Sequence, residues 1–139
     1  RYRFVDGKVA LYNKIDTAFT YLNENTGLFK VVNVPMLDDL KEYCELAAKT
    51  AEEQKEYFTG PLGNDVFQCS PMPWVTYTHI SHTNSGKKDN ATPLFDWGKY
   101  YEKDGRIMIP ISVQAHHSFV DGLHIGQFVE ELKRFLNEY

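Results

Sequence analysis

The chain has 139 residues, with 15 Lys and Arg against 19 Asp and Glu, and a formal net charge of −4. That length predicts one domain with a single core, and 42% hydrophobic with 24% charged residues excludes a disordered tail. An acidic chain without a Lys/Arg cluster attracts few phosphates, so we expect no nucleic-acid partner. No apolar run approaches the ~20 residues that span a bilayer, so we expect no membrane partner. Two cysteines, Cys44 and Cys69, make no disulfide framework, which favours a reducing, cytoplasmic location.

The first half of the chain is predicted to form strands followed by one helix. The expected strands lie at residues 2–5, 9–12, 18–22 and 28–32. Asp6-Gly7 joins the first two into a hairpin, because this dipeptide readily adopts the positive φ angles of a tight turn. Apolar residues at helical spacing predict an amphipathic helix from about Asp38 to Tyr57. Since the chain opens inside a predicted strand without a methionine, we expect residues 1–139 to be a single domain from the C-terminal part of a longer protein.

The second half is predicted to contain extended segments and a final helix. Val66 to Ile80 is strand-like in composition, although Pro71 and Pro73 limit sheet pairing at one end. The remaining expected elements are a polar loop at 81–92, a hairpin of 97–101 with 106–115, and a helix over 123–137. Strands mixed with two amphipathic helices predict an α/β fold, a two-layer sandwich of a mixed sheet with helices.

Three of the five histidines lie within nine residues, from His116 to His124. An apolar strand is predicted to run into this segment and a helix to leave it, which holds side chains rigidly beside an open cleft. Imidazole titrates near neutral pH, so a histidine here can take and return a proton as a general base. We expect Asp121 to cap the helix or to pair with a cation.

A metal site is the second interpretation of the same segment. His116, His117, Asp121 and His124 are all competent ligands. Adjacent residues on a strand point to opposite faces, however, so His116 and His117 cannot easily bind one ion. The cysteines do not complete a zinc ligand set either, and we expect no metal.

Three motifs resemble those of the chloramphenicol acetyltransferase family. Residues 116–122 read His-His-Ser-Phe-Val-Asp-Gly and match its HHxxxDG motif, while residues 70–74 resemble its Ser-x-x-Pro-Trp segment. Residues 98–100, Gly-Lys-Tyr, resemble a strand of the family. The resemblance covers essentially the whole chain and implies the coenzyme A-dependent acyltransferase fold without its N-terminal third.

The resemblance also implies catalytic roles. His117 matches the general base, which deprotonates the acceptor hydroxyl as it attacks the thioester of acetyl-CoA. Ser70 matches the serine whose hydroxyl binds the oxyanion of the tetrahedral intermediate. Asp121 matches a structural aspartate that pairs with an arginine.

Binding residues can be carried over in the same way. Phe29 matches an aromatic wall of the acceptor pocket, and Lys99 and Tyr100 fall where the family lies close to coenzyme A. His82 stands at a pocket position that is usually leucine, and Asp96 stands where the family usually has threonine. These two polar groups indicate an acceptor that is different from chloramphenicol or less apolar.

The resemblance therefore predicts acetyl transfer from acetyl-CoA to an alcohol, with chloramphenicol as the leading acceptor and antibiotic resistance as the role. Acetyl-CoA is expected as co-substrate, with no tightly bound cofactor. Because members of the family are trimers, it also implies a homotrimer with active sites between subunits. Two alternatives are a dihydrolipoyl-type acyltransferase core, which shares only HxxxDG, and a non-catalytic relative that only binds or assembles.

Overall fold

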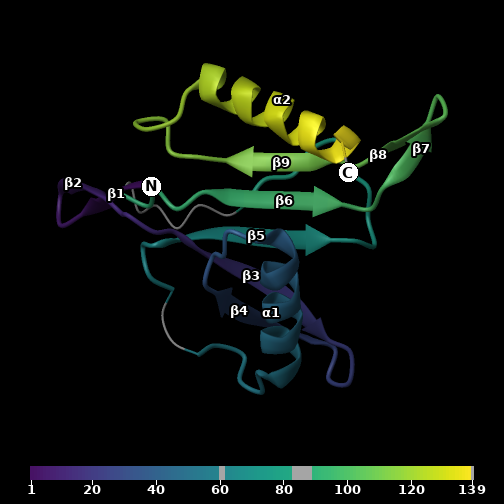
Figure 1. The fold of residues 1–139 in the computed structure, drawn as a ribbon, viewed down its shortest axis with the longest axis horizontal. Coiled ribbons are helices and arrows are strands. Elements are labelled where there is room, and N and C mark those ends of the chain that lie inside the picture. The colour runs from purple at the N-terminus through teal and green to yellow at the C-terminus, as the bar shows by residue number, and fades with distance from the viewer. Residues whose placement is uncertain (60–61, 83–88, 139) are drawn as a thin grey trace.

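A five-stranded mixed sheet is the centre of the computed structural model, which describes residues 1–59, 62–82 and 89–138 (Figure 1). In spatial order its strands are β4 (Leu28–Val34), β3 (Asp16–Asn23), β5 (Val66–Met72), β6 (Leu94–Gly98) and β9 (Ile111–Gln114). Strands β3, β5 and β6 are parallel, whereas the edge strands β4 and β9 run antiparallel to their neighbours. The predicted α/β fold with a mixed sheet is confirmed.

The two helices pack on the same face of this sheet. They are α1 (Leu40–Glu53) and α2 (Gly122–Glu138). Phe19, Cys69 and Phe95 are cross-strand partners in one row, so their side chains share a face. Phe19 packs against the core cluster to which α1 contributes Ala51. Phe95 lies 5.3 Å, between ring centroids, from Phe128 of α2. Helices and sheet therefore form the two layers of the predicted sandwich.

The face of the sheet away from the helices is polar. Ser70, Asp96 and Ser112 form the neighbouring cross-strand row, and side chains alternate along a strand. Gln68 and Gln114 lie in the next row on that same face. The alternation of side chains thus places the aromatic residues that pack against the helices on one face and the polar residues that can bind a ligand on the other.

Two small hairpins project from the main sheet (Figure 1). Their strands are β1 (Tyr2–Val5) with β2 (Lys8–Leu11), and β7 (Tyr101–Lys103) with β8 (Arg106–Met108). Asp6 and Gly7 have φ angles of 50° and 74°, which confirms the predicted tight turn. The first hairpin is attached to the main sheet by buried Arg3, whose guanidinium donates to the carbonyl of Val66 at 2.7 Å.

The prediction of one long hairpin over 97–101 and 106–115 is wrong. The structure divides it into the β7–β8 hairpin and the β6–β9 pair of the main sheet. Pro110 interrupts the second arm because it has no N–H to donate, although its carbonyl still accepts from Gly98 at 3.0 Å.

Two further predictions differ from the structure at their boundaries. Strand β5 ends at Met72, and the segment 73–80 forms no strand, because Pro73 cannot donate and Val75 turns back to the carbonyl of Met72. The first helix is shorter than predicted at both ends. Asp39 caps its start by accepting from the N–H of Glu42 at 2.8 Å, and the backbone of Gln54 is extended, with ψ at 120°, which ends the helix at Glu53. Of the predicted polar loop, residues 83–88 lie outside the described residues.

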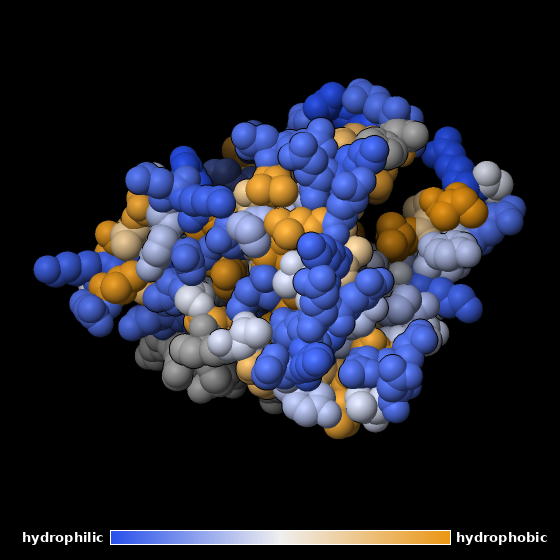
Figure 2. Space-filling model, turned by 60° about the horizontal axis from the view of Figure 1, so that its bottom comes forward, coloured by the Kyte–Doolittle hydropathy of each residue, from blue (hydrophilic) through white to orange (hydrophobic). Residues whose placement is uncertain are grey.

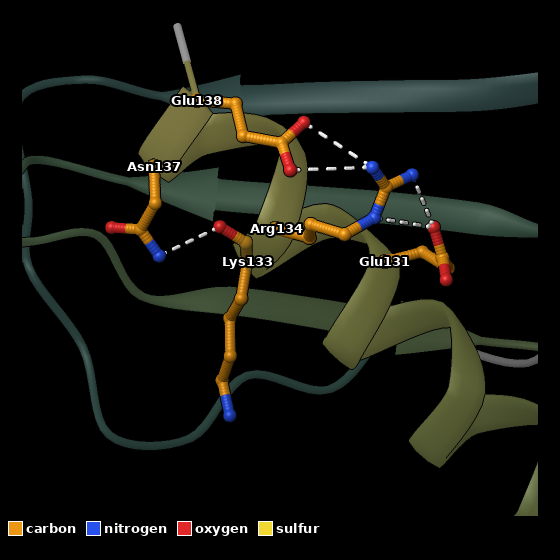
Figure 3. A network of polar contacts seen from close by, with 5 residues as sticks. All are labelled: Glu131, Lys133, Arg134, Asn137 and Glu138. Carbon is orange, nitrogen blue, oxygen red and sulfur yellow. Dashed lines mark hydrogen bonds and ion pairs between the residues drawn. The ribbon is translucent and has the colours of Figure 1, made fainter.

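Helix α2 presents a charged outer surface. Figure 3 shows the Arg134 guanidinium between the carboxylates of Glu131 and Glu138, at 2.9 Å and 3.2 Å. Pairs at these spacings stabilise a helix by about 0.2–0.5 kcal/mol each. None of the described helices is both long enough and apolar enough to cross a membrane.

The inner surface of α2 borders an apolar groove of about 710 Å³. Phe67, Phe95 and Trp97 line its sheet side, and Phe128 and Leu132 line its helix side. No described residue of α2 is fully buried. Helix α2 therefore covers its part of the sheet incompletely. Figure 2, in which the bottom of the Figure 1 view comes forward, shows hydrophobic side chains that reach the surface between hydrophilic ones.

The end of α1 is attached to β4 through a buried lysine. Lys30 is 5% exposed, and its ammonium donates to the carbonyl of Gln54 at 2.5 Å. The same ammonium lies 5.3 Å from the ring centroid of Tyr21. The amide of Gln54 donates in turn to the carbonyl of Val31 at 2.9 Å. A cation at this position is favourable, because the last carbonyls of a helix carry partial negative charge.

We expect Lys30→Met to lower the free energy of unfolding by about 1–3 kcal/mol, because it leaves a carbonyl at the helix end without its donor. Urea unfolding followed by circular dichroism measures the change. The matched control is Lys49→Met, at an exposed pair with Glu53, which should stay within about 0.5 kcal/mol of wild type. Equal effects of the two substitutions would contradict the structural role of Lys30.

Candidate functional site

The histidine segment follows β9 and packs on the first hairpin. Strand β9 ends at Gln114, so His116 and His117 lie beyond it and not on its two faces. Strand alternation therefore does not direct their two side chains to opposite faces of the sheet. The His116 ring meets Phe4 edge-on at 5.2 Å, and Phe119 lies 4.8 Å from Phe4, both between centroids. These contacts hold the segment, while the His117 side chain is exposed.

The hydrogen bond of His117 sets which ring nitrogen carries the proton. Its Nδ1 lies 3.2 Å from the carbonyl oxygen of Val120. A carbonyl can only accept, so Nδ1 is the donor in this contact. In the neutral ring the lone pair is then on Nε2. An exposed imidazole with its basic nitrogen defined in this way can remove a proton from a bound hydroxyl.

Asp121 caps helix α2. Its carboxylate accepts from the N–H groups of Leu123 at 2.9 Å and His124 at 3.3 Å. In return the Asp121 N–H donates to Nδ1 of His124 at 3.1 Å, as in a capping box with histidine at the third helical position. The hydrogen bond from the His124 N–H lowers the pKa of Asp121. The same Nδ1 lies 3.0 Å from Oδ1 of the Asp121 carboxylate.

Ser70 lies beside a buried acidic residue on the polar face of the sheet. Its cross-strand partner, Asp96, is 0% exposed. Nε2 of His82 lies 2.9 Å from Oδ1 of Asp96, and the hydroxyl of Tyr77 donates to the Asp96 carbonyl at 3.1 Å. Oδ2 of Asp96 is buried and has no partner among the described residues. The sequence singled out His82 and Asp96 separately, and the structure joins them.

A cavity of about 180 Å³ lies next to this pair. Ser70 and His82 both line it, together with Thr20 and Gln68. Cys69 also borders it, although its side chain belongs to the row that faces the helices; burial and, to a smaller extent, the charge of Asp96 raise the pKa of this thiol to about 11. The thiol therefore remains protonated at neutral pH and is a poor nucleophile. Hydroxyl, amide and imidazole groups are the polar chemistry of this cavity.

The other predicted binding residues lie near the C-terminal ends of β5 and β6. Phe29 faces Trp74 edge-on at 6.0 Å between centroids, and both are about half exposed. The N–H of Lys99 donates to the carbonyl of Val75 at 2.7 Å. A Cβ on Gly98 would lie 2.6 Å from that same carbonyl oxygen, so the close approach requires glycine. The Ser-x-x-Pro-Trp and Gly-Lys-Tyr segments thus pack together and leave the side chains of Lys99 and Tyr100 exposed.

One chain does not bring His117 and Ser70 together. In register, Gln114 of β9 lies level with Gln68 of β5, two strands away. Ser70 lies two residues beyond this level in one direction, and β9, which is antiparallel to its neighbour, leads the chain toward His117 in the other. With strands about 4.8 Å apart and about 3.3 Å per residue, Ser70 is more than ~10 Å from the end of β9, after which His117 follows three residues later. A base and an oxyanion donor at this distance cannot act on one carbonyl.

Reasoning from the sequence missed the contact between His82 and Asp96. The signal was present, because both residues place polar groups where the family pattern is leucine or threonine. For the metal interpretation, no group of three or more His, Cys, Asp or Glu within residues 1–59, 62–82 and 89–138 could hold an ion.

Comparison with known proteins gives the family. The family model described as chloramphenicol acetyltransferase matches residues 1–133. The chain belongs to the chloramphenicol acetyltransferase family. It is 25% identical over 137 residues to the chloramphenicol acetyltransferase of Klebsiella sp, covering 96% of this chain and 63% of that relative. It is 31% identical over 134 residues to that of Streptomyces acrimycini, covering 94% of this chain and 61% of the relative. The chain thus spans less than two thirds of these relatives' length.

Solved structures agree with this family and its fold. A chloramphenicol acetyltransferase superposes with a TM-score of 0.86 at 26% identity, covering 98% of this chain and 68% of that one. The dihydrolipoamide acetyltransferase of Azotobacter vinelandii gives a TM-score of 0.66 at 18% identity, covering 97% of this chain and 59% of that one. The second likeness shows only the shared coenzyme A-dependent acyltransferase fold.

The His82–Asp96 contact predicts a coupled effect on stability. We expect His82→Leu to lower the free energy of unfolding by about 1–3 kcal/mol, because it leaves a buried carboxylate without its donor. Asp96→Thr should cost less, because the 34% exposed His82 side chain can still bind water. The double variant should be more stable than His82→Leu alone, with a coupling energy of about 0.5–3 kcal/mol. Urea unfolding of all four proteins completes the cycle, and strictly additive effects would show that the pair is not coupled.

The cap on α2 predicts a difference between two substitutions of Asp121. Asp121→Ala should lower the melting temperature at neutral pH. Asp121→Asn should lower it much less, because asparagine caps equally well. The pKa of Asp121 is depressed in the folded state, so the carboxylate's contribution is present above its unfolded pKa and is lost as the pH falls through its folded pKa. The advantage of wild type over Asp121→Asn should therefore shrink below about pH 4. Thermal melts across this range are the measurement, and a pH-independent difference would contradict the assignment.

Proposed function

We propose that the chain transfers an acetyl group from acetyl-CoA to an alcohol, with His117 as general base and chloramphenicol as the leading acceptor. The observation that carries the proposal is the contact of His117 Nδ1 with the Val120 carbonyl, which leaves Nε2 as the basic nitrogen. Membership of the chloramphenicol acetyltransferase family supports the reaction class. The acceptor is a proposal as well, because the chain spans only 63% of the first of these relatives.

In the proposed reaction, Nε2 of His117 takes the proton of the acceptor hydroxyl as its oxygen attacks the thioester carbonyl. The tetrahedral intermediate carries its negative charge on the former carbonyl oxygen, to which the Ser70 hydroxyl donates. Removing one such donor typically lowers the rate about 10²–10³-fold. Collapse of the intermediate breaks the carbon–sulfur bond, and the imidazolium returns the proton to the coenzyme A sulfur. The products are the acetyl ester and free coenzyme A.

Binding roles follow from the remaining predicted residues. The exposed ammonium of Lys99 is suited to the phosphates of coenzyme A, and the 65% exposed ring of Tyr100 offers an aromatic surface beside it. Phe29 and Trp74 present an apolar wall for an acceptor ring. No metal and no tightly bound cofactor takes part in this proposal.

We further propose that the chain works as a homotrimer with each site between two copies. The separation of His117 from Ser70 within one chain supports this arrangement, because both groups must reach one carbonyl. His117 would come from one copy, and Ser70 with most of the acceptor pocket from its neighbour. In a closed ring every copy then contributes to two sites.

Mixing two inactive variants tests the proposal. We expect His117→Ala and Ser70→Ala each to abolish or strongly reduce release of coenzyme A thiol from acetyl-CoA in the presence of chloramphenicol. Co-assembly in equal amounts should restore about one quarter of wild-type activity, since a quarter of the interfaces then pair an intact His117 with an intact Ser70. No recovery in a confirmed mixed assembly would place both groups in one chain's site.

The acceptor serves as a control in the same assay. Dihydrolipoamide in place of chloramphenicol distinguishes the alternative dihydrolipoyl-type reaction. Binding of coenzyme A without turnover of either acceptor would indicate a non-catalytic relative.

A further inference from the structure

We propose that Ser70, His82 and Asp96 form a second catalytic centre, contained within one chain, in which His82 activates the Ser70 hydroxyl to attack and hydrolyse small acyl esters. The centre uses neither His117 nor a second copy of the chain. It goes beyond the proposed acetyl transfer, in which Ser70 only donates a hydrogen bond. Three features carry it: an oriented histidine, a serine beside it, and a cavity that both residues border.

The first feature is the carboxylate that orients His82. Asp96 is 0% exposed, and its Oδ1 lies 2.9 Å from Nε2 of His82, whose side chain is 34% exposed. An ionised carboxylate only accepts, so Nε2 carries the proton in this contact and the lone pair of the neutral ring is on Nδ1. The carboxylate also stabilises the imidazolium that forms when Nδ1 takes a proton. Asp96 is thus a positioning residue, and His82 is the base.

The Asp96 carboxylate acts on His82 alone among the side chains that the structure describes. Its Oδ2 is buried and has no partner within residues 1–59, 62–82 and 89–138. The neighbouring Tyr77 hydroxyl donates to the backbone carbonyl of Asp96 and not to its side chain. A buried acid that is bonded only to a more exposed histidine is the arrangement that orients the base in a serine-histidine-aspartate triad.

The second feature is the position of Ser70. It is the cross-strand partner of Asp96, about 4.8 Å away across one strand spacing, and its side chain lies on the same polar face of the sheet. Within one chain, His82 is therefore the histidine beside Ser70, whereas His117 follows the end of β9, which is more than ~10 Å away. Cys69 is not an alternative nucleophile, because its side chain faces the helices and burial raises the pKa of its thiol to about 11.

The third feature is the cavity. Ser70 and His82 both border the cavity of about 180 Å³, together with Thr20 of the neighbouring strand β3 and Gln68. An apolar cavity of about 150 Å³ binds benzene, so this one has room for a short acyl group or a single ring. The hydroxyl of Thr20 and the amide of Gln68 are donors of the kind that stabilise an oxyanion. Nucleophile, base and oxyanion donors thus border one space.

The proposed hydrolysis has two steps. In the first, Nδ1 of His82 takes the hydroxyl proton as Oγ of Ser70 attacks the acyl carbonyl. The bond from the acyl carbon to the leaving oxygen breaks, and the imidazolium returns the proton to that oxygen, which leaves an acyl ester on Ser70. In the second step His82 deprotonates a water molecule, which attacks this ester and releases the carboxylic acid and free Ser70. A base in this position typically contributes about 10²–10⁴-fold to the rate.

Labelling with a fluorophosphonate tests the nucleophile directly. An activated serine hydroxyl forms a bond to the phosphorus of this reagent and releases fluoride. Peptide mass spectrometry of the labelled 139-residue chain should place the label on Ser70. The chain should also hydrolyse p-nitrophenyl acetate with an initial burst of about one nitrophenolate per chain, as expected when the acyl-enzyme accumulates.

Variants of the other two residues test the base and its orientation. His82→Gln keeps a donor for Oδ1 of Asp96 but has no basic nitrogen, so it should lower the labelling rate about 10²–10⁴-fold. Asp96→Asn should lower the maximal labelling rate without changing the reagent concentration that gives half of it, because Asp96 sets the His82 tautomer and does not border the cavity. A merely structural role would change both quantities. His79→Gln, at an exposed histidine of the same segment, is the control and should label at the wild-type rate.

His117→Ala separates this hydrolysis from the proposed acetyl transfer. It should abolish thiol release that depends on chloramphenicol, yet retain labelling of Ser70 and hydrolysis of p-nitrophenyl acetate. Labelling without thiol release in wild type leaves the second centre standing and rejects acetyl transfer, and thiol release without labelling does the reverse.

Three results would overturn the second centre: no label on Ser70 of wild type, loss of labelling in His117→Ala, or a wild-type labelling rate in His82→Gln. Because wild type alone decides whether Ser70 is labelled, the test remains decisive if a variant fails to fold.

Discussion

The parallel pairing of β5 with β6 is the constraint on which the rest of the structure depends. Its register sets Cys69 beside Phe95 and Ser70 beside Asp96. Both helices therefore pack on one face of the sheet, and the other face is polar. A shift by one residue would turn every one of these side chains to the opposite face. The same register ends with Met72 beside Gly98, where the two C-terminal segments pack through the Val75 carbonyl. Fold and candidate site are thus two consequences of one strand alignment.

The features that the sequence predicted correctly are local ones. The Asp6-Gly7 turn and the cap at Asp121 depend on residues a few positions apart, and both are found in the structure. The predicted boundaries of the first helix and the predicted single hairpin over residues 97–115 were wrong, because caps and tertiary pairing decide where a helix or strand ends. The contact between His82 and Asp96 joins residues 14 positions apart in the sequence, and no periodicity encodes such a contact. The motifs located the chemistry, but only the fold shows which side chains meet.

The acidic residue inside the sheet is unfavourable for stability and therefore calls for a physical explanation. A buried carboxylate with one partner is less stable than a threonine, which can satisfy its hydroxyl locally. His82 offsets part of the penalty through Oδ1 and leaves Oδ2 open. Function commonly resides where local stability is reduced in this way. The position of the pair, level with Ser70 and on the face without helices, agrees with such a role.

The proposed base is held by a different means, yet it depends on the same strand. His117 lies outside the sheet, and its segment is positioned by the ring of His116 and by Phe119 against Phe4. Those aromatic contacts fix the base only as firmly as the hairpin itself is fixed. The hairpin is in turn bonded through Arg3 to the carbonyl of Val66, the first residue of β5. Strand β5 therefore positions the segment of the proposed base at its start and carries Ser70, the proposed oxyanion donor, further along, which keeps the two at a fixed separation within one chain. A rigid separation of this kind suits a site completed by a second copy, because each copy presents both halves in a defined geometry.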